Sequence, residues 1–336
     1  MRAKTFLVAA LIAAVSGAAA QAQTKIRLSY IVPVSNWATM LVQKQDLMKH
    51  HGKSYTLDII HFQGTPQLIT ALSVGELEIA NFGFTTLPLA IVNAGMNDLR
   101  IISDELQDGV PGHYSNQFLV RKDGPIQSWA DLKGKVVASN AYGSGTDIPL
   151  RIMLAKHNLQ DKRDVTIIET PIPTMPAMLA EKKVELVPLP RPFTANPQVV
   201  AATRTIGTTG DAVGINQLGM WVARAGVIEK NRAAFMDFME DALRIERWYL
   251  DPKNHDAAVK IAMAITKTPA ERWDSWLFRK DGQNGDYYRN LDGRPDVDAL
   301  QKVIDLQVKH GFLKQTIDVK KFVDLSLVEE AVRRLR

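Results

Sequence analysis

The fold is decided by residues 57–81, which read LDIIHFQGTPQLITALSVGELEIAN. Residues 57–61 predict a strand, Thr65-Pro66 begins a helix with proline at its first position, and Gly75 ends that helix. Residues 77–81 predict a second strand directly afterwards. A strand–helix–strand unit of this kind is typical of an α/β protein with a mostly parallel sheet flanked by helices.

The same order of elements continues on both sides of this stretch. Residues 25–31 alternate polar and apolar, which predicts a strand, and Ser35 or Asn36 can cap a helix running to about His50. Ser128-Trp129-Ala130-Asp131 resembles a capping box with aspartate in place of glutamate. Further strands are expected at 99–103, 117–120, 135–139, 165–169 and 184–188, and further helices at 86–95, 146–157 and 174–183.

The chain becomes helical from about residue 230. Apolar side chains recur there at helical spacing and are expected to face the core. They are Phe235, Phe238, Met239, Ala242, Ile245 and Tyr249, and later Leu300, Val303, Ile304 and Val308.

The first 22 residues have the three parts of a secretory signal peptide. Arg2 and Lys4 form a positive start, residues 6–15 form an apolar run, and residues 18–22 supply small residues for cleavage. The apolar run is too short to cross a bilayer, which takes about 20 residues. We therefore expect an exported protein of the periplasm that is cleaved and carries no lipid anchor.

Composition excludes several classes of function. The chain has 336 residues and no cysteine, which removes disulfides, cysteine nucleophiles, thiolate metal sites and lipid attachment through cysteine. Its net charge of +5 includes Arg2 and Lys4 of the leader and forms no long basic run, so no nucleic-acid partner is expected. The histidines are scattered without metal-ligand spacing, and neither a metal nor another cofactor is expected.

Candidate ligand contacts lie in the loops between strands and helices, because open α/β sheets bind ligands at the carboxyl ends of their strands. These loops are rich in hydroxyls, amides, small residues and aromatics. The candidates are Ser35, Asn36, Trp37, Gln63, Thr65, Asn81, Phe82, Thr85, Thr86, Tyr142, Ser144, Thr146, Thr170 and Arg191.

The chemistry of these loops indicates an anionic ligand. Helix amino termini present free N–H groups and partial positive charge, and short polar side chains add hydrogen bonds. The loops contain a single acidic residue, Asp147, and one basic residue, Arg191, which could contact the anion or form a surface ion pair. Serines and threonines at helix starts are also ordinary caps, and Phe82 and Phe84 alternate, so at least one of them is expected in the core.

The chain resembles the periplasmic substrate-binding proteins of ABC importers in the nitrate, sulfonate and taurine group, which are related to the thiamine-precursor-binding proteins. The resemblance spans nearly all of residues 25–332. It rests on residues 128–138 (SWADLKGKVVA), 143–146 (GSGT), 177–180, 184–187, 309–312 and 322–326. The chain departs from the family where residues 181–183 lack a glycine, and where Pro190-Arg191-Pro192-Phe193 replaces the more common Glu-Pro-Phe.

The resemblance implies the two-lobe type II periplasmic binding fold. Lobe 1 would comprise residues 24–116 and 221–336, and lobe 2 residues 117–220, with hinge crossings near 115–118 and 217–221. A small anion would bind between the closing lobes and pass to the membrane subunits of an ABC permease, and we expect the binding protein to be a monomer. The family pattern places Trp37, Gln63, Asn81, Thr85, Tyr142, Ser144 and Thr146 near the cleft.

Other functions stay open at this point. The ligand could be an aromatic carboxylate instead of a sulfonate, nitrate or related anion. The chain could be a periplasmic enzyme on the same scaffold, although its candidate loops contain no histidine or paired carboxylates for acid–base work. A surface adhesin would instead show exposed aromatic patches. We expect a binding protein without catalytic activity.

Overall fold

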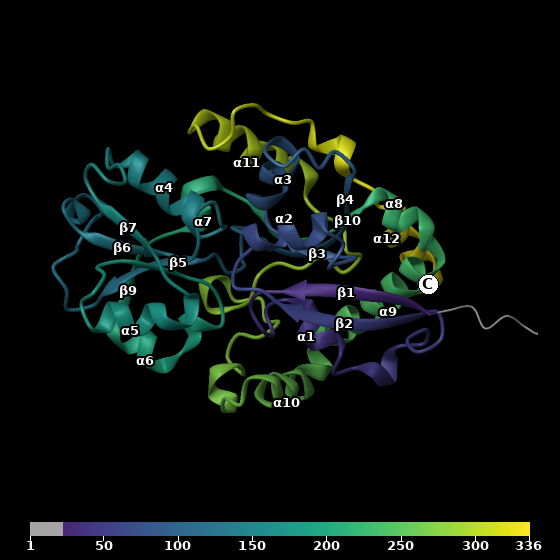
Figure 1. The fold of residues 1–336 in the computed structure, drawn as a ribbon. Helices are drawn as coiled ribbons and strands as arrows, with labels where there is room; N and C mark the ends of the chain where they lie inside the picture. Colours follow the sequence, from purple (N-terminus) through teal and green to yellow (C-terminus); the bar gives the residue numbers. More distant parts are fainter. Residues whose placement is uncertain (1–22) are drawn as a thin grey trace, which may run out of the picture.

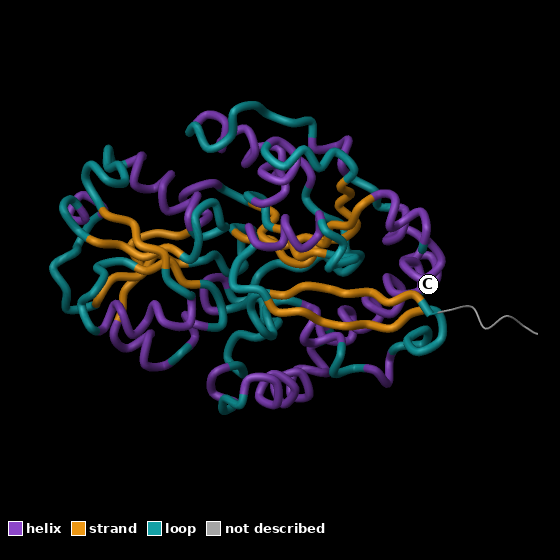
Figure 2. The backbone as a smooth tube through the Cα atoms, viewed as in Figure 1, coloured by secondary structure: helices purple, strands orange, loops and turns teal. Residues whose placement is uncertain are grey.

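The computed structural model describes residues 23–336, and the predicted signal peptide at 1–22 lies outside them. The strands gather in two places, each covered by helices (Figures 1 and 2). The strands are β1 (Thr24–Tyr30), β2 (Tyr55–His61), β3 (Ala80–Phe82), β4 (Leu99–Asp108), β5 (Gln117–Arg121), β6 (Val136–Ser139), β7 (Thr166–Glu169), β8 (Val187–Leu189), β9 (Thr203–Thr208) and β10 (Asn216–Arg224).

The helices pack on both sides of these strands. They are α1 (Trp37–Leu41), α2 (Pro66–Ser73), α3 (Thr86–Val92), α4 (Asp147–Lys156), α5 (Met175–Ala180), α6 (Pro197–Ala202), α7 (Thr209–Val213), α8 (Ala225–Lys230), α9 (Arg232–Leu250), α10 (His255–Thr266), α11 (Val297–Lys309) and α12 (Ser326–Arg334). In Figure 1, α4 and α7 lie on one side of β5–β9, and α5 and α6 lie on the other.

The first group of strands combines parallel and antiparallel pairs. β1 and β2 pair in parallel from Thr24↔Tyr55 to Tyr30↔His61, and a parallel bridge joins Leu28 to Ile79 just before β3. β10 lies between β3 and β4 and is antiparallel to both. The carboxyl ends of β1, β2 and β3 therefore lie at one edge, as the strand–helix–strand pattern predicted.

The second group repeats this arrangement. β6 and β7 are parallel, and a parallel bridge joins Val137 to Leu186 just before β8. β5 lies between β8 and β9 and is antiparallel to both. Each group therefore contains parallel and antiparallel pairs. The antiparallel strands are β5 and β10, and each of them directly follows a passage of the chain from one group to the other.

The two chain passages between the strand groups lie against each other. The connection from β4 to β5 contains Ser115 and Asn116, and Asn116 O accepts a hydrogen bond from Thr209 N at 2.8 Å. Ser115 Oγ accepts from Gly210 N at 2.9 Å and donates to the buried carboxylate of Asp108 at 2.5 Å. A Cβ on Gly109 would lie 2.8 Å from Gly214 O, so this close approach of the two backbones requires glycine.

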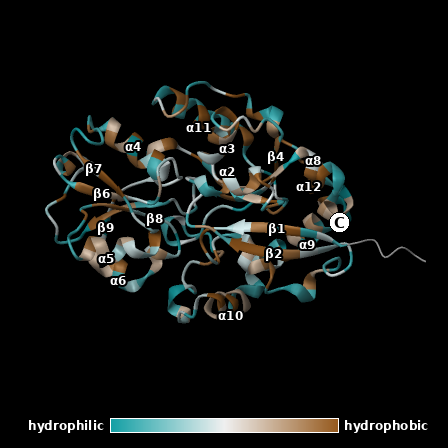
Figure 3. Cartoon of the chain, viewed as in Figure 1, coloured by the Kyte–Doolittle hydropathy of each residue, from teal (hydrophilic) through white to brown (hydrophobic). Residues whose placement is uncertain are grey.

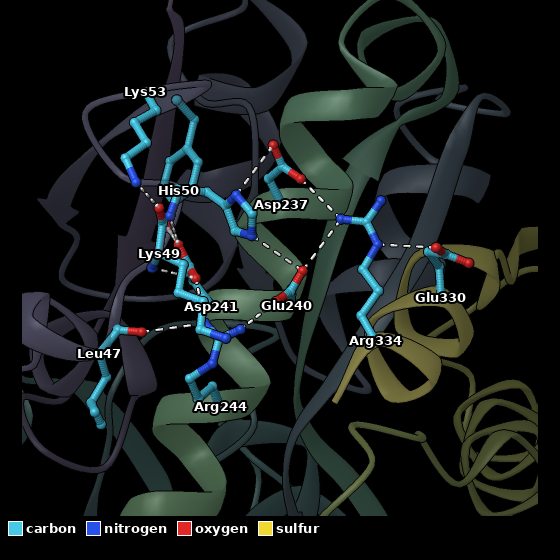
Figure 4. A network of polar contacts seen from close by, with 11 residues as sticks. Leu47, Lys49, His50, Lys53, Asp237, Glu240, Asp241, Arg244, Glu330 and Arg334 are labelled. Atoms are coloured by element: carbon cyan, nitrogen blue, oxygen red, sulfur yellow. Dashed lines mark hydrogen bonds and ion pairs between the residues drawn. The ribbon is translucent and has the colours of Figure 1, made fainter. Parts of the chain in front are cut away.

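The predicted helix from residue 36 to about residue 50 is wrong beyond residue 41. α1 ends at Leu41, and the amides of Lys49 and His50 donate to the carboxylate of Asp241 on α9 at 2.8 and 2.9 Å (Figure 4). In a helix these amides would bond to carbonyls four residues earlier. The buried carboxylate takes both amides instead and fixes the segment as an irregular loop.

The predicted core stripes are largely confirmed. Phe235, Phe238 and Met239 of α9 are buried with the other apolar residues of that stripe, and so are Leu300, Val303 and Ile304 of α11. Val308 is only partly buried against the same core. Figure 3, coloured by residue hydropathy, shows hydrophobic stretches along β1 and β2. No helix within residues 23–336 has the length and hydropathy needed to cross a membrane.

Candidate functional site

A cavity of about 100 Å³ lies where loops from both strand groups meet. The first group contributes the loops after β1 and β3, and the second contributes the loops after β6, β7 and β8. Seven of the residues expected from sequence line it: Ser35, Asn36, Thr65, Asn81, Ser144, Thr146 and Arg191. The cavity is small compared with sites for drug-sized ligands, which measure about 300–1,000 Å³. Its size suits a compact chemical group.

The carboxyl ends of the strands bring these loops together. β1 ends at Tyr30, β3 at Phe82, β6 at Ser139 and β8 at Leu189, and each cavity loop follows directly. Hydrogen bonds join the two sides near the cavity, from Asn140 Nδ2 to Gln63 O at 3.2 Å and from Ser35 Oγ to Arg191 O at 3.1 Å. The strand-edge rule applied to the sequence therefore pointed to loops that line this cavity.

Asn36 is held in a fixed orientation at the cavity wall. Its Oδ1 accepts from the amides of Ile31 and Val32 at 2.9 and 2.8 Å, and its Nδ2 donates to Glu105 Oε2 at 3.0 Å. Glu105 Oε1 also accepts from Trp37 N at 2.9 Å. Complete burial raises the pKa of Glu105 to about 7, although these hydrogen bonds and the charge of Arg289 oppose the rise.

Several donors at the cavity lack an acceptor. Asn81 is buried and its Nδ2 has no hydrogen-bond partner among residues 23–336. The backbone amides of Gly145 and Thr146 also have no protein acceptor within this part of the chain. Both amides stand at the start of α4, where free N–H groups and the helix dipole favour negative charge. The cavity therefore presents hydrogen-bond donors from both strand groups.

The carboxylate nearest to these donors is turned away and neutralised. Asp147 Oδ2 accepts from Gly143 N at 2.9 Å, and Asp147 pairs with Arg151 one helical turn later at 2.9 Å. Within residues 23–336, no aspartate, glutamate or histidine lines the cavity, and Arg191 is the charged residue of its wall. The site can hold an acceptor-rich ligand, but its wall offers no acid–base pair.

The structure gives Arg191 a different role from the anion contact that the sequence suggested. Its Nε donates to Gly285 O at 3.3 Å, and its Nη2 donates to Gln283 O at 2.9 Å. The guanidinium also stacks over the rings of Tyr114 and Trp276, 4.4 and 5.2 Å from their centroids. Its donors already have partners, so Arg191 reaches the cavity as a buried structural residue that ties the loop after β8 to residues 283–285.

Four other expected contacts lie in the core. Trp37 is fully buried and stacks on Tyr249 and Phe278, with ring centroids 6.1 and 5.4 Å away. Phe82, Thr85 and Thr86 are also buried and do not line the cavity. Residues near the start of a helix that packs on a sheet can face either the cavity or the core. Their spacing in the sequence did not show which of these two directions each residue takes.

The remaining three expected contacts lie outside this cavity. Gln63 and Thr170 line a separate cavity of about 250 Å³, and Gln63 also lines another of about 350 Å³. Tyr142 is 65% exposed and covers the guanidinium of Arg151, with 5.1 Å between that group and the ring centroid.

Several residues that line or support the cavity were not among the expected contacts, and they include Tyr287, Asn116 and Glu105. Tyr287 lines it from the carboxyl-terminal third of the chain, and its hydroxyl donates to Asn116 Oδ1 at 2.5 Å and accepts from Arg191 N at 3.1 Å. Asn116 also lines the cavity, and Glu105 lies behind Asn36. Glu105 carried little signal in the sequence, because β4 reads LRIISDELQD and contains the acidic residues Asp104 and Asp108 as well. Tyr287 carried none, because it sits in an irregular loop.

No metal-binding constellation is present among the described residues. Within residues 23–336, no group of three histidine, aspartate or glutamate side chains is arranged to hold a metal ion.

Comparisons with known proteins identify the family and the fold. The model of the NMT1-like family matches residues 19–263. The alkanesulfonate-binding protein SsuA from Xanthomonas axonopodis pv. citri, solved bound to MOPS, is 20% identical with a TM-score of 0.69 over 90% of this chain and 99% of that one. The periplasmic nitrate-binding protein NrtA from Synechocystis PCC 6803 is 14% identical with a TM-score of 0.72 over 94% and 90%.

An enzyme has a similar fold. The desulfurization enzyme DszB, solved as a cysteine-to-serine mutant in complex with biphenyl-2-sulfinic acid, is 13% identical with a TM-score of 0.62 over 92% of this chain and 99% of that one. No curated protein matches the sequence. At these identities the structural likeness shows a common fold.

Proposed function

Because the chain belongs to the NMT1-like family, we propose that it is the substrate-binding protein of an ABC importer. It captures a small anion, such as a sulfonate, nitrate or a related organic anion, and delivers it to the membrane permease. The observation that carries this proposal is the cavity wall, which combines unpartnered donors at Asn81, Gly145 and Thr146 with a complete lack of lining carboxylates within residues 23–336.

The physical chemistry of the cavity favours an anion over a cation. A cation would need carboxylates to replace its hydration shell, whereas an anion is satisfied by N–H and O–H donors. Leu106, Ile172 and Leu218 supply an apolar part of the wall, which suits an organic group next to the charge. The fold neighbours named for binding alkanesulfonate and nitrate are consistent with this chemistry.

The proposal includes two lobes that close on the ligand. We assign residues 24–116 and 216–336 to lobe 1 and residues 117–215 to lobe 2, with the two adjacent chain passages as the hinge. The sequence placed the boundary after residue 220, but β10 begins at Asn216 and pairs with β3 and β4 of the first strand group. The paired contacts of Ser115 and Asn116 with residues 209–210 support this assignment. A ligand shifts such an equilibrium only by gaining contacts in the closed state, and donors on both sides of the cavity provide them.

The same function explains the leader. A signal peptide at residues 1–22 that is cleaved on export would deliver a monomer to the periplasm without a lipid anchor. The periplasmic fold neighbours support this location. The closed protein would then meet its permease at the inner membrane.

An enzyme with this fold is the second candidate, favoured by the likeness to DszB. That structure is of a cysteine-to-serine mutant in complex with a sulfinic acid, whereas this chain contains no cysteine. Turnover of a bound anion by the purified protein, followed by mass spectrometry, would support the enzyme. Stable binding without any product supports the transport protein.

A thermal-shift screen tests the proposed function. The purified protein is melted with sulfonates, nitrate, bicarbonate, aromatic carboxylates, amino acids and amines. A ligand at 100 times its Kd stabilises the folded state by about 2.7 kcal/mol, which raises the melting temperature by several degrees. Stabilisation by an aromatic carboxylate alone would select that alternative. Stabilisation by amines or amino acids but by no anion would overturn the proposal.

A further inference from the structure

A second cavity of about 350 Å³ adjoins the first. Ile31, Val32 and Ile172 line both cavities, so the two spaces meet at these three apolar side chains. The first carries hydroxyl and amide side chains on part of its wall, beside apolar ones. The second is larger and extends away from them, toward the segment that follows α10.

The walls of the second cavity are largely apolar. The loop after β8 contributes Pro192 and Phe193, and the segment after β7 contributes Pro173. Trp273 forms part of the opposite wall and is fully buried, with its Nε1 donating to Thr268 Oγ1 at 2.7 Å. Both strand groups contribute to this space, and the hydrogen-bonded tryptophan gives it a fixed side. Such a wall suits an apolar ligand body.

One cation in this apolar wall has no partner. Arg272, in the single turn Ala270–Arg272, lines the second cavity, and its guanidinium forms no hydrogen bond, ion pair or ring contact within residues 23–336. Partial burial lowers the pKa of Arg272, and no nearby carboxylate opposes that effect. The other titratable side chain of the wall is His61, whose Nε2 lies 3.2 Å from Ile31 O.

The contrast with Arg191 shows what this lack of partners means. The Nε, Nη1 and Nη2 atoms of Arg191 each donate to a protein oxygen, and the guanidinium stacks on two aromatic rings, so it is a structural group. Arg272 keeps all five of its N–H donors while lying against proline and aromatic side chains. No carboxylate lines either cavity within the described residues, so an anion entering the second cavity would meet no repulsion from its wall.

We propose that the ligand is an elongated organic dianion that spans both cavities. One anionic group binds the amide and hydroxyl donors of the first cavity, an apolar body passes Ile31, Val32 and Ile172, and a second anionic group pairs with Arg272. This inference rests on the proposed function and specifies its substrate class. A carboxylate or sulfonate at the far end would form a charge-assisted hydrogen bond with the guanidinium, which is stronger than a neutral one.

Isothermal titration calorimetry with matched ligands tests the inference. The probes are alkanesulfonates of two to eight carbons and the same compounds with a terminal carboxylate, with nitrate as a compact anion. We expect the wild-type protein to bind the dianion at least tenfold more tightly than the monoanion at one or more chain lengths. Arg272→Gln should remove this preference and leave the affinity for the alkanesulfonates unchanged.

Arg279→Gln provides the control, because Arg279 is exposed, pairs with Asp274 and lines neither cavity. Equal affinity for mono- and dianions at every length, or binding of nitrate alone, would overturn the inference and leave the proposed function intact. A dianion preference that persists in Arg272→Gln would overturn the assignment to Arg272. Binding of no anion at all would overturn the proposed function, and the inference with it.

Discussion

Glu105 lies directly behind Asn36, with 3.0 Å between the carboxylate Oε2 and the amide Nδ2. The same carboxylate oxygen would lie 2.9 Å from a Cβ placed on Gly219, which lines the cavity from β10. A glycine is therefore needed where β10 passes between the buried glutamate and the ligand space. The orientation of Asn36 depends on this close packing.

Gly219→Ala should disturb the cavity floor. The added methyl group would meet Glu105 Oε2, and Asn81 Nδ2 would lie only 3.3 Å away, so both side chains must shift. We expect the affinity for a ligand found in the thermal-shift screen to fall about tenfold or more, which corresponds to about 1.4 kcal/mol. Calorimetric titration measures it. Gly226→Ala is the control, because nothing lies within 4 Å of its Cβ position, and an equal loss there would contradict this account.

Asn81→Asp should abolish anion binding. The substitution replaces an unpartnered buried donor with a carboxylate at nearly the same volume, so the ligand would meet a negative charge instead of an N–H group. Ligand-induced thermal stabilisation should disappear. Asn97→Asp adds the same charge at an exposed position and should keep the full shift. Retained binding in Asn81→Asp would place the anion elsewhere.

Stability should decrease as pH rises from about 4 to about 7. Burial raises the pKa of Asp108 from 3.8 to about 7, and burial likewise raises the pKa of Asp104 to about 6. For each aspartate, at pH values between its unfolded pKa of 3.8 and its raised folded pKa, the native state holds a proton that the unfolded state has released. Each raised pKa therefore costs about 1.4 kcal/mol per pH unit across that window and adds no further loss above it.

Asp108→Asn isolates the contribution of the Asp108 carboxyl. The variant should show a shallower loss of unfolding free energy between pH 5 and pH 7, measured by urea denaturation at several pH values. Asp123→Asn provides a comparison at an exposed aspartate and should leave the slope as in the wild type. An unchanged slope in Asp108→Asn would mean that this carboxyl does not titrate in the window.

Arg191→Met should reduce stability more than it reduces ligand contacts. The change leaves the carbonyls of Gln283 and Gly285 without their donor, and each unsatisfied buried group costs about 1–3 kcal/mol. We expect a loss of at least about 2 kcal/mol in urea denaturation. Arg279→Met, at an exposed arginine, should stay within about 0.5 kcal/mol. A tenfold loss of affinity with unchanged stability would instead restore Arg191 as an anion contact.

Asp241→Ala should be strongly destabilising. The buried carboxylate accepts from Lys49 N, His50 N and Tyr55 OH and pairs with Arg244, so it holds the loop after α1 on α9 (Figure 4). Removing one partner of a buried ion pair costs about 3–5 kcal/mol. Asp237→Ala, on the same helix but partly exposed, should cost much less in the same denaturation experiment. Equal losses would mean that burial of Asp241 adds nothing.

Local signals in the sequence were sufficient for most of the fold. The capping box at Ser128 and Asp131 is present, and the strand-helix order after β1 correctly located the loops that line the cavity. These features depend on a few consecutive residues. The helix expected to reach residue 50 failed because Asp241, nearly two hundred positions away, captures its amides.

The composition of the site was harder to predict than its location. Ser35 lies two positions before Trp37, the first residue of α1. Trp37 packs on Tyr249, whereas Ser35 lines the cavity. Arg191 looked like a free charge because its partners, at residues 283–285, belong to an irregular loop without periodicity. Contacts between distant segments decide such details, and no local pattern encodes them.

The wall of the cavity includes Tyr287, which belongs to the carboxyl-terminal part of the chain and is therefore synthesised late. Its phenol bonds Asn116 and the Arg191 backbone, so the wall is unfinished until segments separated by more than 150 positions have met. Assembly that depends on such distant pairings is slow, because loop-closure entropy must be overcome first. A truncated or partly translocated chain would therefore lack a finished binding wall, and ligand would stabilise only molecules whose folding is complete.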